Sequence, residues 1–190
     1  MKLQERLPDT VTVNGRRIRV DLDFRNVLRM FDILQDNGMT PDAQERLAAQ
    51  CVTKHPVPGV VAAVRALFAS KESKAAQEHK RVTSFEQDAP LIRAAFMQAY
   101  GIDLWTARLH WLQFMELLQG LPDDTQYMNV IQIRSRPMPK PTKHNREERE
   151  WLRKAKAQYA IHESEEERER SYQRDVANVF RGLMSMIPGG

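Results

Sequence analysis

Apolar residues recur at intervals of three and four along most of the chain, and this spacing is typical of one buried face of an α-helix. Near the N-terminus it predicts a helix that starts at Asp23 and that Asn37-Gly38 ends. A second helix is expected with Thr40 as its N-cap and Pro41 in its first turn, and a third over residues 60–70. The pattern therefore predicts a mainly α-helical protein.

One stretch near the N-terminus departs from this spacing. In "TVTVNGRRIRV", residues 10–20, apolar and polar residues alternate on both sides of Asn14-Gly15. Asn-Gly tolerates the two positive φ angles of a type I′ turn, so this stretch predicts a β-hairpin. Because two strands alone are only marginally stable, the hairpin is expected to pack against the helices.

The strongest helical pattern begins at Ser84. Ser84 and Gln87 match a capping box, and Gly101 stands where a helix needs a left-handed residue to end. Asp103 is expected to cap the next helix, which runs to Gln119. With so short a connection, the two helices are predicted to form an antiparallel hairpin.

Apolar residues occupy most of the circumference of the helix predicted from Asp103 to Gln119, so this helix is expected at the centre of the protein. Trp105, Trp111 and Phe114 are predicted to fill the interior around it. His110 lies among them. We interpret it as a packed side chain, bonded to backbone or to a carboxylate such as Glu116 or Asp88, rather than as an acid–base group.

The C-terminal third is divided by a proline-rich segment. Residues 1–136 are predicted to form the helical body, with its hairpin at about 10–20, and its last helix is capped by Asp124. Residues 137–145 form a basic linker with several prolines. Residues 146–190 form a C-terminal helical extension, which Asn145 and Glu148 open with a second capping-box pattern.

Charge is concentrated beside that linker. The formal net charge is +4, and residues 134–154 hold eight Lys or Arg against three Glu. The candidate basic contact residues are Arg134, Arg136, Lys140 and Lys143. They could meet nucleic acid or an acidic protein, but a solvated linker looks the same. No aromatic residues interleave with them, so binding to nucleic acid is the less favoured alternative.

The sequence contains no pattern of a known catalytic or metal site. P-loop, nucleophile-elbow and zinc-protease motifs are missing, and the five histidines stand far apart. Cys51 is the single cysteine and is expected as a small apolar side chain. We therefore expect no enzyme, no cofactor and no metal. No apolar run approaches the length of a membrane span, and the N-terminus is unlike a signal peptide, which predicts a cytoplasmic protein.

A last apolar strip lies near the C-terminus. At helical spacing it would place six side chains on one face, which are the candidate partner or oligomer interface: Val176, Val179, Phe180, Leu183, Met184 and Ile187. The strip either folds back onto the body or stays exposed as a contact face.

Two long motifs carry a family resemblance. The first is F-x-x-D-x-x-x-I-x-x-A-F-x-x-x-Y-G-I-D-L, and the second is L-H-W-x-x-F-x-x-L-x-x-G-L-P. The first matches at Phe85, Asp88, Ile92, Ala95, Phe96, Tyr100, Gly101, Ile102, Asp103 and Leu104. The second matches at Leu109, His110, Trp111, Phe114, Leu117, Gly120, Leu121 and Pro122.

With these motifs, residues 7–161 resemble tail assembly chaperones of siphophages and prophages, which are encoded next to the tape measure gene. The resemblance implies a non-enzymatic protein that binds the tape measure protein, recruits the major tail tube protein and self-associates. It further implies action in the cytoplasm of the bacterial host and absence from the mature virion. A structural tail or neck protein of the virion is the alternative.

Overall fold

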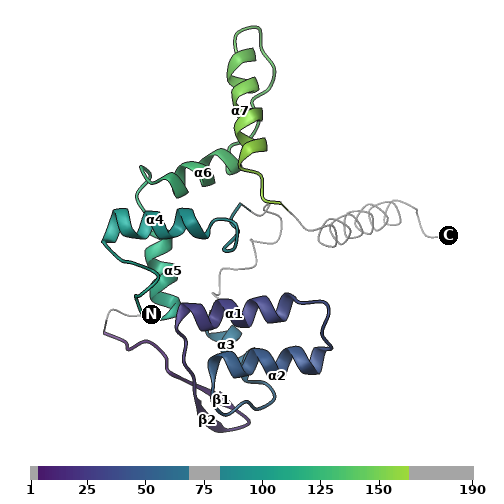
Figure 1. The fold of residues 1–190 in the computed structure, drawn as a ribbon, viewed down its shortest axis with the longest axis vertical. Coiled ribbons are helices and arrows are strands. Elements are labelled where there is room, and N and C mark those ends of the chain that lie inside the picture. The colour runs from purple at the N-terminus through teal and green to yellow at the C-terminus, as the bar shows by residue number, and fades with distance from the viewer. Residues whose placement is uncertain (1–3, 69–81, 163–190) are drawn as a thin grey trace, which may run out of the picture. The chain divides into compact units, whose positions relative to one another are not determined.

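The computed structural model describes residues 4–68 and 82–162, and these residues are mainly helical (Figure 1). They form a two-stranded hairpin and seven α-helices, which confirms the predicted fold class. In chain order the elements are β1 (Thr10–Val13), β2 (Arg16–Arg19), α1 (Phe24–Gln35), α2 (Pro41–Val52), α3 (Val60–Phe68), α4 (Ala89–Tyr100), α5 (Trp111–Gln119), α6 (Gln126–Ser135) and α7 (Arg146–Gln158).

The chain divides into two compact units. The first unit comprises residues 1–81 and 88–129, and the second comprises residues 82–87 and 130–190. In its described part, the first unit holds the hairpin, α1 to α5 and the start of α6. The second unit holds the rest of α6 and α7. The charged stretch at residues 69–81 and the predicted terminal strip lie outside the described residues.

The N-terminal hairpin forms as the sequence predicts. Its two strands are antiparallel, with Val13 opposite Arg16. Asn14 and Gly15 have φ angles of 50° and 76°, which are the positive values that a type I′ turn requires. Val11 and Val13 are buried, and β1 contacts α3, so the helices cover one face of the hairpin as expected.

The first two helices begin where their sequence signals predict. The Thr40 side chain accepts a hydrogen bond from the N–H of Ala43, and Pro41 stands in the first turn of α2. α1 ends differently from the prediction. Its C-cap is Asp36 in an extended conformation, so Asn37-Gly38 follows the helix without forming a left-handed cap. α1 and α2 lie side by side (Figure 1) and bury side chains such as Val27, Met30 and Val52 between the elements of this unit.

The prediction of a helix from Asp103 to Gln119 is wrong in its first half. Residues 101–110 are not helical apart from turns, and α5 begins at Trp111. Gly101 does adopt φ 66° and ends α4 as predicted. After it, the carboxylate of Asp103 accepts the N–H of Trp105 at 2.9 Å, which is a local turn. The longer connection lets α4 and α5 cross instead of forming the predicted antiparallel hairpin (Figure 1).

Tertiary hydrogen bonds explain why residues 103–110 stay out of the helix. The N–H of Phe24 donates to the carbonyl of Leu109 at 2.9 Å, and the N–H of Trp111 donates to the carbonyl of Leu22 at 2.7 Å. Asp23 and His110 thereby form an isolated antiparallel bridge. Backbone N–H and carbonyl groups that are paired with another segment do not require partners within a helix. These two bonds therefore compete with helix formation.

Aromatic rings form the centre of the first unit. Phe114 stacks on Phe24 at 4.8 Å and on Phe96 at 5.3 Å between ring centroids. Trp111 is 6% exposed and packs beside Phe114, which confirms the predicted interior position of both. Trp105 contradicts its prediction, because it is 72% exposed. The turn at Asp103 directs the Trp105 side chain to solvent, whereas a continuous helix would have placed it in the core.

The structure differs from the prediction at three expected helix starts. Thr125, and not Asp124, caps α6, with its hydroxyl accepting the N–H of Met128 at 3.3 Å. The Ser84 hydroxyl accepts the N–H of Gln87 as predicted, but α4 begins beyond them at Ala89. Asn145 stands at the N-cap of α7, yet its side chain bonds to the backbone of residues 140 and 142. For Asn145, nearby backbone groups thus take the place of the first turn of the helix as partners of the side chain.

Candidate interaction surfaces

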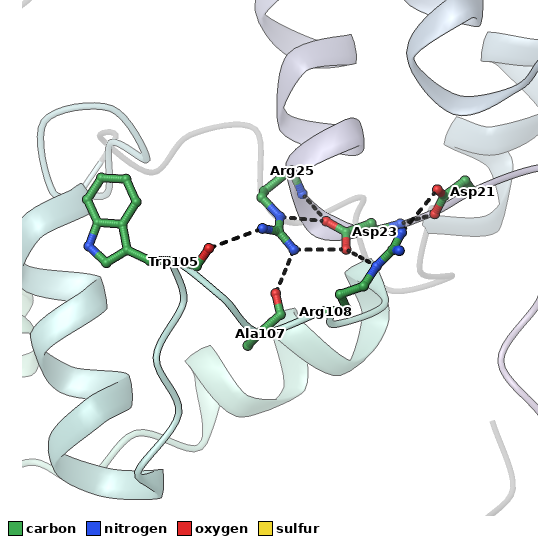
Figure 2. A network of polar contacts seen from close by, with 6 residues as sticks. All are labelled: Asp21, Asp23, Arg25, Trp105, Ala107 and Arg108. Carbon is green, nitrogen blue, oxygen red and sulfur yellow. Dashed lines mark hydrogen bonds and ion pairs between the residues drawn. The ribbon is translucent and has the colours of Figure 1, made fainter.

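A network of charged and backbone groups connects the start of α1 to the segment before α5 (Figure 2). The Nε atom of Arg25 lies 3.0 Å from Oδ1 of Asp23. The same guanidinium donates to the carbonyl oxygen of Ala107 at 2.6 Å and to that of Trp105 at 3.4 Å. Arg25 thus uses its planar set of donors to hold a carboxylate and two carbonyls together.

Asp23 is the centre of this network. It is 8% exposed, and it also caps α1 by accepting the N–H of Arg25 at 3.1 Å. Arg108 approaches it from the other side, with Nε 3.7 Å from Oδ2 (Figure 2). Hydrogen bonding to Asp23, more than the charge of that residue, raises the pKa of Arg25 above its ordinary value, and partial burial opposes this effect. The network therefore joins the start of α1 to the segment before α5 through one carboxylate.

Trp105 is displayed on the surface beside this network. The residue is 72% exposed, and its ring lies under the guanidinium of Arg93, whose central carbon is 4.4 Å from the ring centroid. Its N–H is bound by Asp103 and its carbonyl by Arg25. Met97, one turn after Arg93 on α4, is 50% exposed. We call Arg93, Met97 and Trp105 the tryptophan platform.

His110 has a structural role, as the sequence interpretation expected. Its Nδ1 accepts the N–H of Leu112 at 3.1 Å, so the histidine is the N-cap of α5. Its Nε2 lies 3.0 Å from the carbonyl oxygen of Pro8. The ring proton must therefore sit on Nε2 and be donated to Pro8. The backbone supplies both partners, in place of the carboxylates of Glu116 or Asp88.

Two cavities border the second strand. One, of about 410 Å³, lies between residues 7–9, residues 19–23 and residues 108–110. The other, of about 870 Å³, is lined by residues 19–21, Asn26 and residues 50–56. Within residues 4–68 and 82–162, no three His, Cys, Asp or Glu side chains are grouped so that they could hold a metal ion.

Cys51 lines the larger cavity and is half-buried rather than fully buried. Its Sγ lies 3.5 Å from the carbonyl oxygen of Leu47, one turn earlier in α2. Burial is the main cause that raises the pKa of this thiol. A raised pKa leaves less thiolate at neutral pH, which agrees with a packed thiol and not with a nucleophile.

The four basic candidates differ in their surroundings. Arg134 donates to the carbonyl oxygens of Tyr159 and Val82 at 2.6 and 3.0 Å. Arg136 pairs with Glu148 at 2.5 Å. Lys140 and Lys143 are exposed in the segment between α6 and α7.

The six residues of the candidate apolar interface, from Val176 to Ile187, lie outside the described residues.

Sequence reasoning missed the tryptophan platform and the Arg25 network. Trp105 was assigned to the interior because its neighbours follow a helical period. The indication available in the sequence was Asp103, whose side chain competes with the helix two residues further on. Apart from Asp23, the local sequence gives no indication of the partners of Arg25, because Trp105 and Ala107 lie 80 and 82 residues away.

The described residues thus define a small helical protein. Apolar side chains such as Trp105 are exposed on it, and polar side chains such as Arg25 and His110 bond to its own backbone. None of the described helices is both long and apolar enough to cross a membrane. A family model described as "Bacteriophage Gp15 protein" matches residues 3–161, so the chain belongs to this bacteriophage protein family. No curated protein and no solved structure matches the chain.

Proposed function

We propose that this phage protein is a tail assembly chaperone that binds the tape measure protein and promotes assembly of the tail tube. It acts without catalysis in the cytoplasm of the bacterial host and leaves before the virion is complete. The observation that carries the proposal is the family match over residues 3–161, which spans both motifs by which the chain resembles such chaperones.

The side chains of the described residues support a binding role over a chemical one. His110 is committed to two backbone partners, and burial disfavours the Cys51 thiolate. Large apolar side chains are displayed instead, including Trp105 at 72% and Trp151 at 55% exposed. Exposed tryptophans are suited to contacts with an apolar client, because they bury a large area with few rotatable bonds.

Co-expression with the tape measure protein from the same phage tests the proposal. The full chain is expected to raise the soluble fraction of the tape measure and to purify with it. An unrelated helical protein of similar size, expressed at the same level, is the control. Equal solubility of the tape measure with and without this chain would remove the chaperone function.

Mass spectrometry of purified virions separates the chaperone from a structural tail or neck protein. The chaperone proposal expects the protein in infected cells but not in particles. Many copies in each particle would favour the structural alternative. Binding to nucleic acid has less support, since Arg134 and Arg136 already have partners within the chain.

A further inference from the structure

We infer that the tryptophan platform is a docking site for the C-terminal segment, residues 163–190, of a second copy of this chain. The occupant is thus a named segment of the same protein, supplied by another molecule. This inference goes beyond the proposed function, because self-association through the platform is measured without any client.

The platform is held in its displayed position before any partner arrives. The Trp105 N–H binds the Asp103 carboxylate at 2.9 Å, and its carbonyl accepts from Arg25 of α1 at 3.4 Å. Arg93 of α4 covers one face of the ring. Two hydrogen bonds therefore hold the backbone of Trp105, and one cation–π contact holds its ring, although solvent reaches most of the residue. A side chain already ordered loses little conformational entropy when a partner binds it.

The chemistry of the platform is that of an interface centre. Tryptophan and arginine are the residues most enriched among the energetically dominant positions of interfaces. Met97 adds an adaptable apolar contact beside them on α4. Arg93 makes its contact with an aromatic face, and a guanidinium in such a contact can also bind a carboxylate through its N–H groups. A matching partner carries apolar side chains and carboxylates close together.

Residues 163–190 have this composition. Their first part, residues 163–170, contains five glutamates and two arginines. Their second part carries the apolar strip that includes Phe180, Leu183 and Met184. Arg93 stands over the Trp105 ring, whereas Arg25 and Arg108 near the same turn are paired with Asp23. The acidic part is complementary to the guanidinium of Arg93, and the apolar part to the exposed indole of Trp105 and thioether of Met97.

Such a contact joins two different surfaces, the platform of one copy and the C-terminal segment of the next. An interface of this type is heterologous, so it builds rings or open chains rather than only symmetric pairs. Association is therefore expected to grow with protein concentration and to weaken as salt screens the acidic part.

Sedimentation velocity of the full chain over a concentration series tests the inference. Trp105→Ala is expected to weaken self-association about 30-fold, the effect of removing an interface centre. Trp151→Ala is the matched control, because it removes another exposed tryptophan, on α7, and leaves the platform intact. It is expected to associate like the wild type.

A mixing experiment tests the heterologous geometry. The double variant Phe180→Asp and Leu183→Asp is expected to lose self-association through its own defective segment. Mixed with Trp105→Ala, it should form complexes again, since one protein supplies a platform and the other an intact segment. Failure of this rescue, association of Trp105→Ala equal to that of Trp151→Ala, or a wild type that stays monomeric would each overturn the inference.

Discussion

Arg25, in the first turn of α1, donates from Nη2 to the carbonyl oxygen of Ala107 at 2.6 Å, although 82 residues separate the two in the chain. This bond, with the pairing of Arg25 to Asp23, fastens the segment before α5 to the start of α1. It keeps residues 103–110 from extending α5, and it thereby leaves Trp105 on the surface.

Removing the carboxylate at the centre of this network should destabilise the first unit. Asp23→Ala loses the cap of α1 and leaves Arg25 without its ionic partner, with an expected cost of about 2 kcal/mol in the free energy of unfolding. Urea denaturation followed by circular dichroism measures it. Glu150→Ala, which breaks only the exposed pair with Lys154, is the control and should cost about 0.3–0.5 kcal/mol. Equal effects of the two variants would mean that the network contributes no more than a surface pair.

Two substitutions of His110 should separate its cap from its bond to Pro8. His110→Asn keeps an acceptor for the N–H of Leu112 and loses only the bond to the Pro8 carbonyl, whereas His110→Ala loses both. We expect the alanine variant to be less stable than the asparagine variant by about 1 kcal/mol, measured by chemical denaturation. An asparagine variant as unstable as the alanine variant would show that capping is not the role of this side chain.

Arg134 should keep the second unit ordered through its hydrogen bonds to backbone carbonyls, in addition to contributing a positive charge. Arg134→Gln keeps a polar side chain but cannot reach both Tyr159 and Val82. Hydrogen–deuterium exchange over residues 146–162 is expected to become faster in this variant, since the end of α7 loses its attachment to α6. Arg136→Gln removes an exposed charge two residues further along the chain and should leave exchange in α7 nearly unchanged. The opposite ranking would assign the support to Arg136.

Cys51 should react slowly with thiol reagents in the native protein. Burial raises its pKa above the ordinary value, so the native state holds less of the reactive thiolate than the unfolded chain does at the same pH. Because the folded pKa is the higher one, the stabilising contribution of the neutral thiol is present below the unfolded pKa and is lost as pH rises through the folded pKa. Ellman's reagent, with and without guanidinium chloride, measures the difference. Equal rates would contradict the packed position of the thiol.

Local chemistry in the sequence was sufficient where a residue and its partner are close in the chain. Asn14-Gly15 formed the predicted turn, Thr40 and Pro41 started α2, and Gly101 ended α4 with a positive φ. The burial of Trp111 and Phe114 also followed from helical spacing. These features depend on steric and hydrogen-bond preferences that act within a few residues.

The sequence by itself determined that the chain is a mainly helical phage protein with an N-terminal hairpin, because periodicity, caps and long motifs are written locally. Only the tertiary structure decided that α5 begins at Trp111, that Thr125 caps α6 and that Trp105 faces solvent. The physical reason is competition between partners. Arg25 and the backbone of Leu22 and Phe24 approach residues 105–111 from far along the chain, and their hydrogen bonds replace those that a continuous helix would have made.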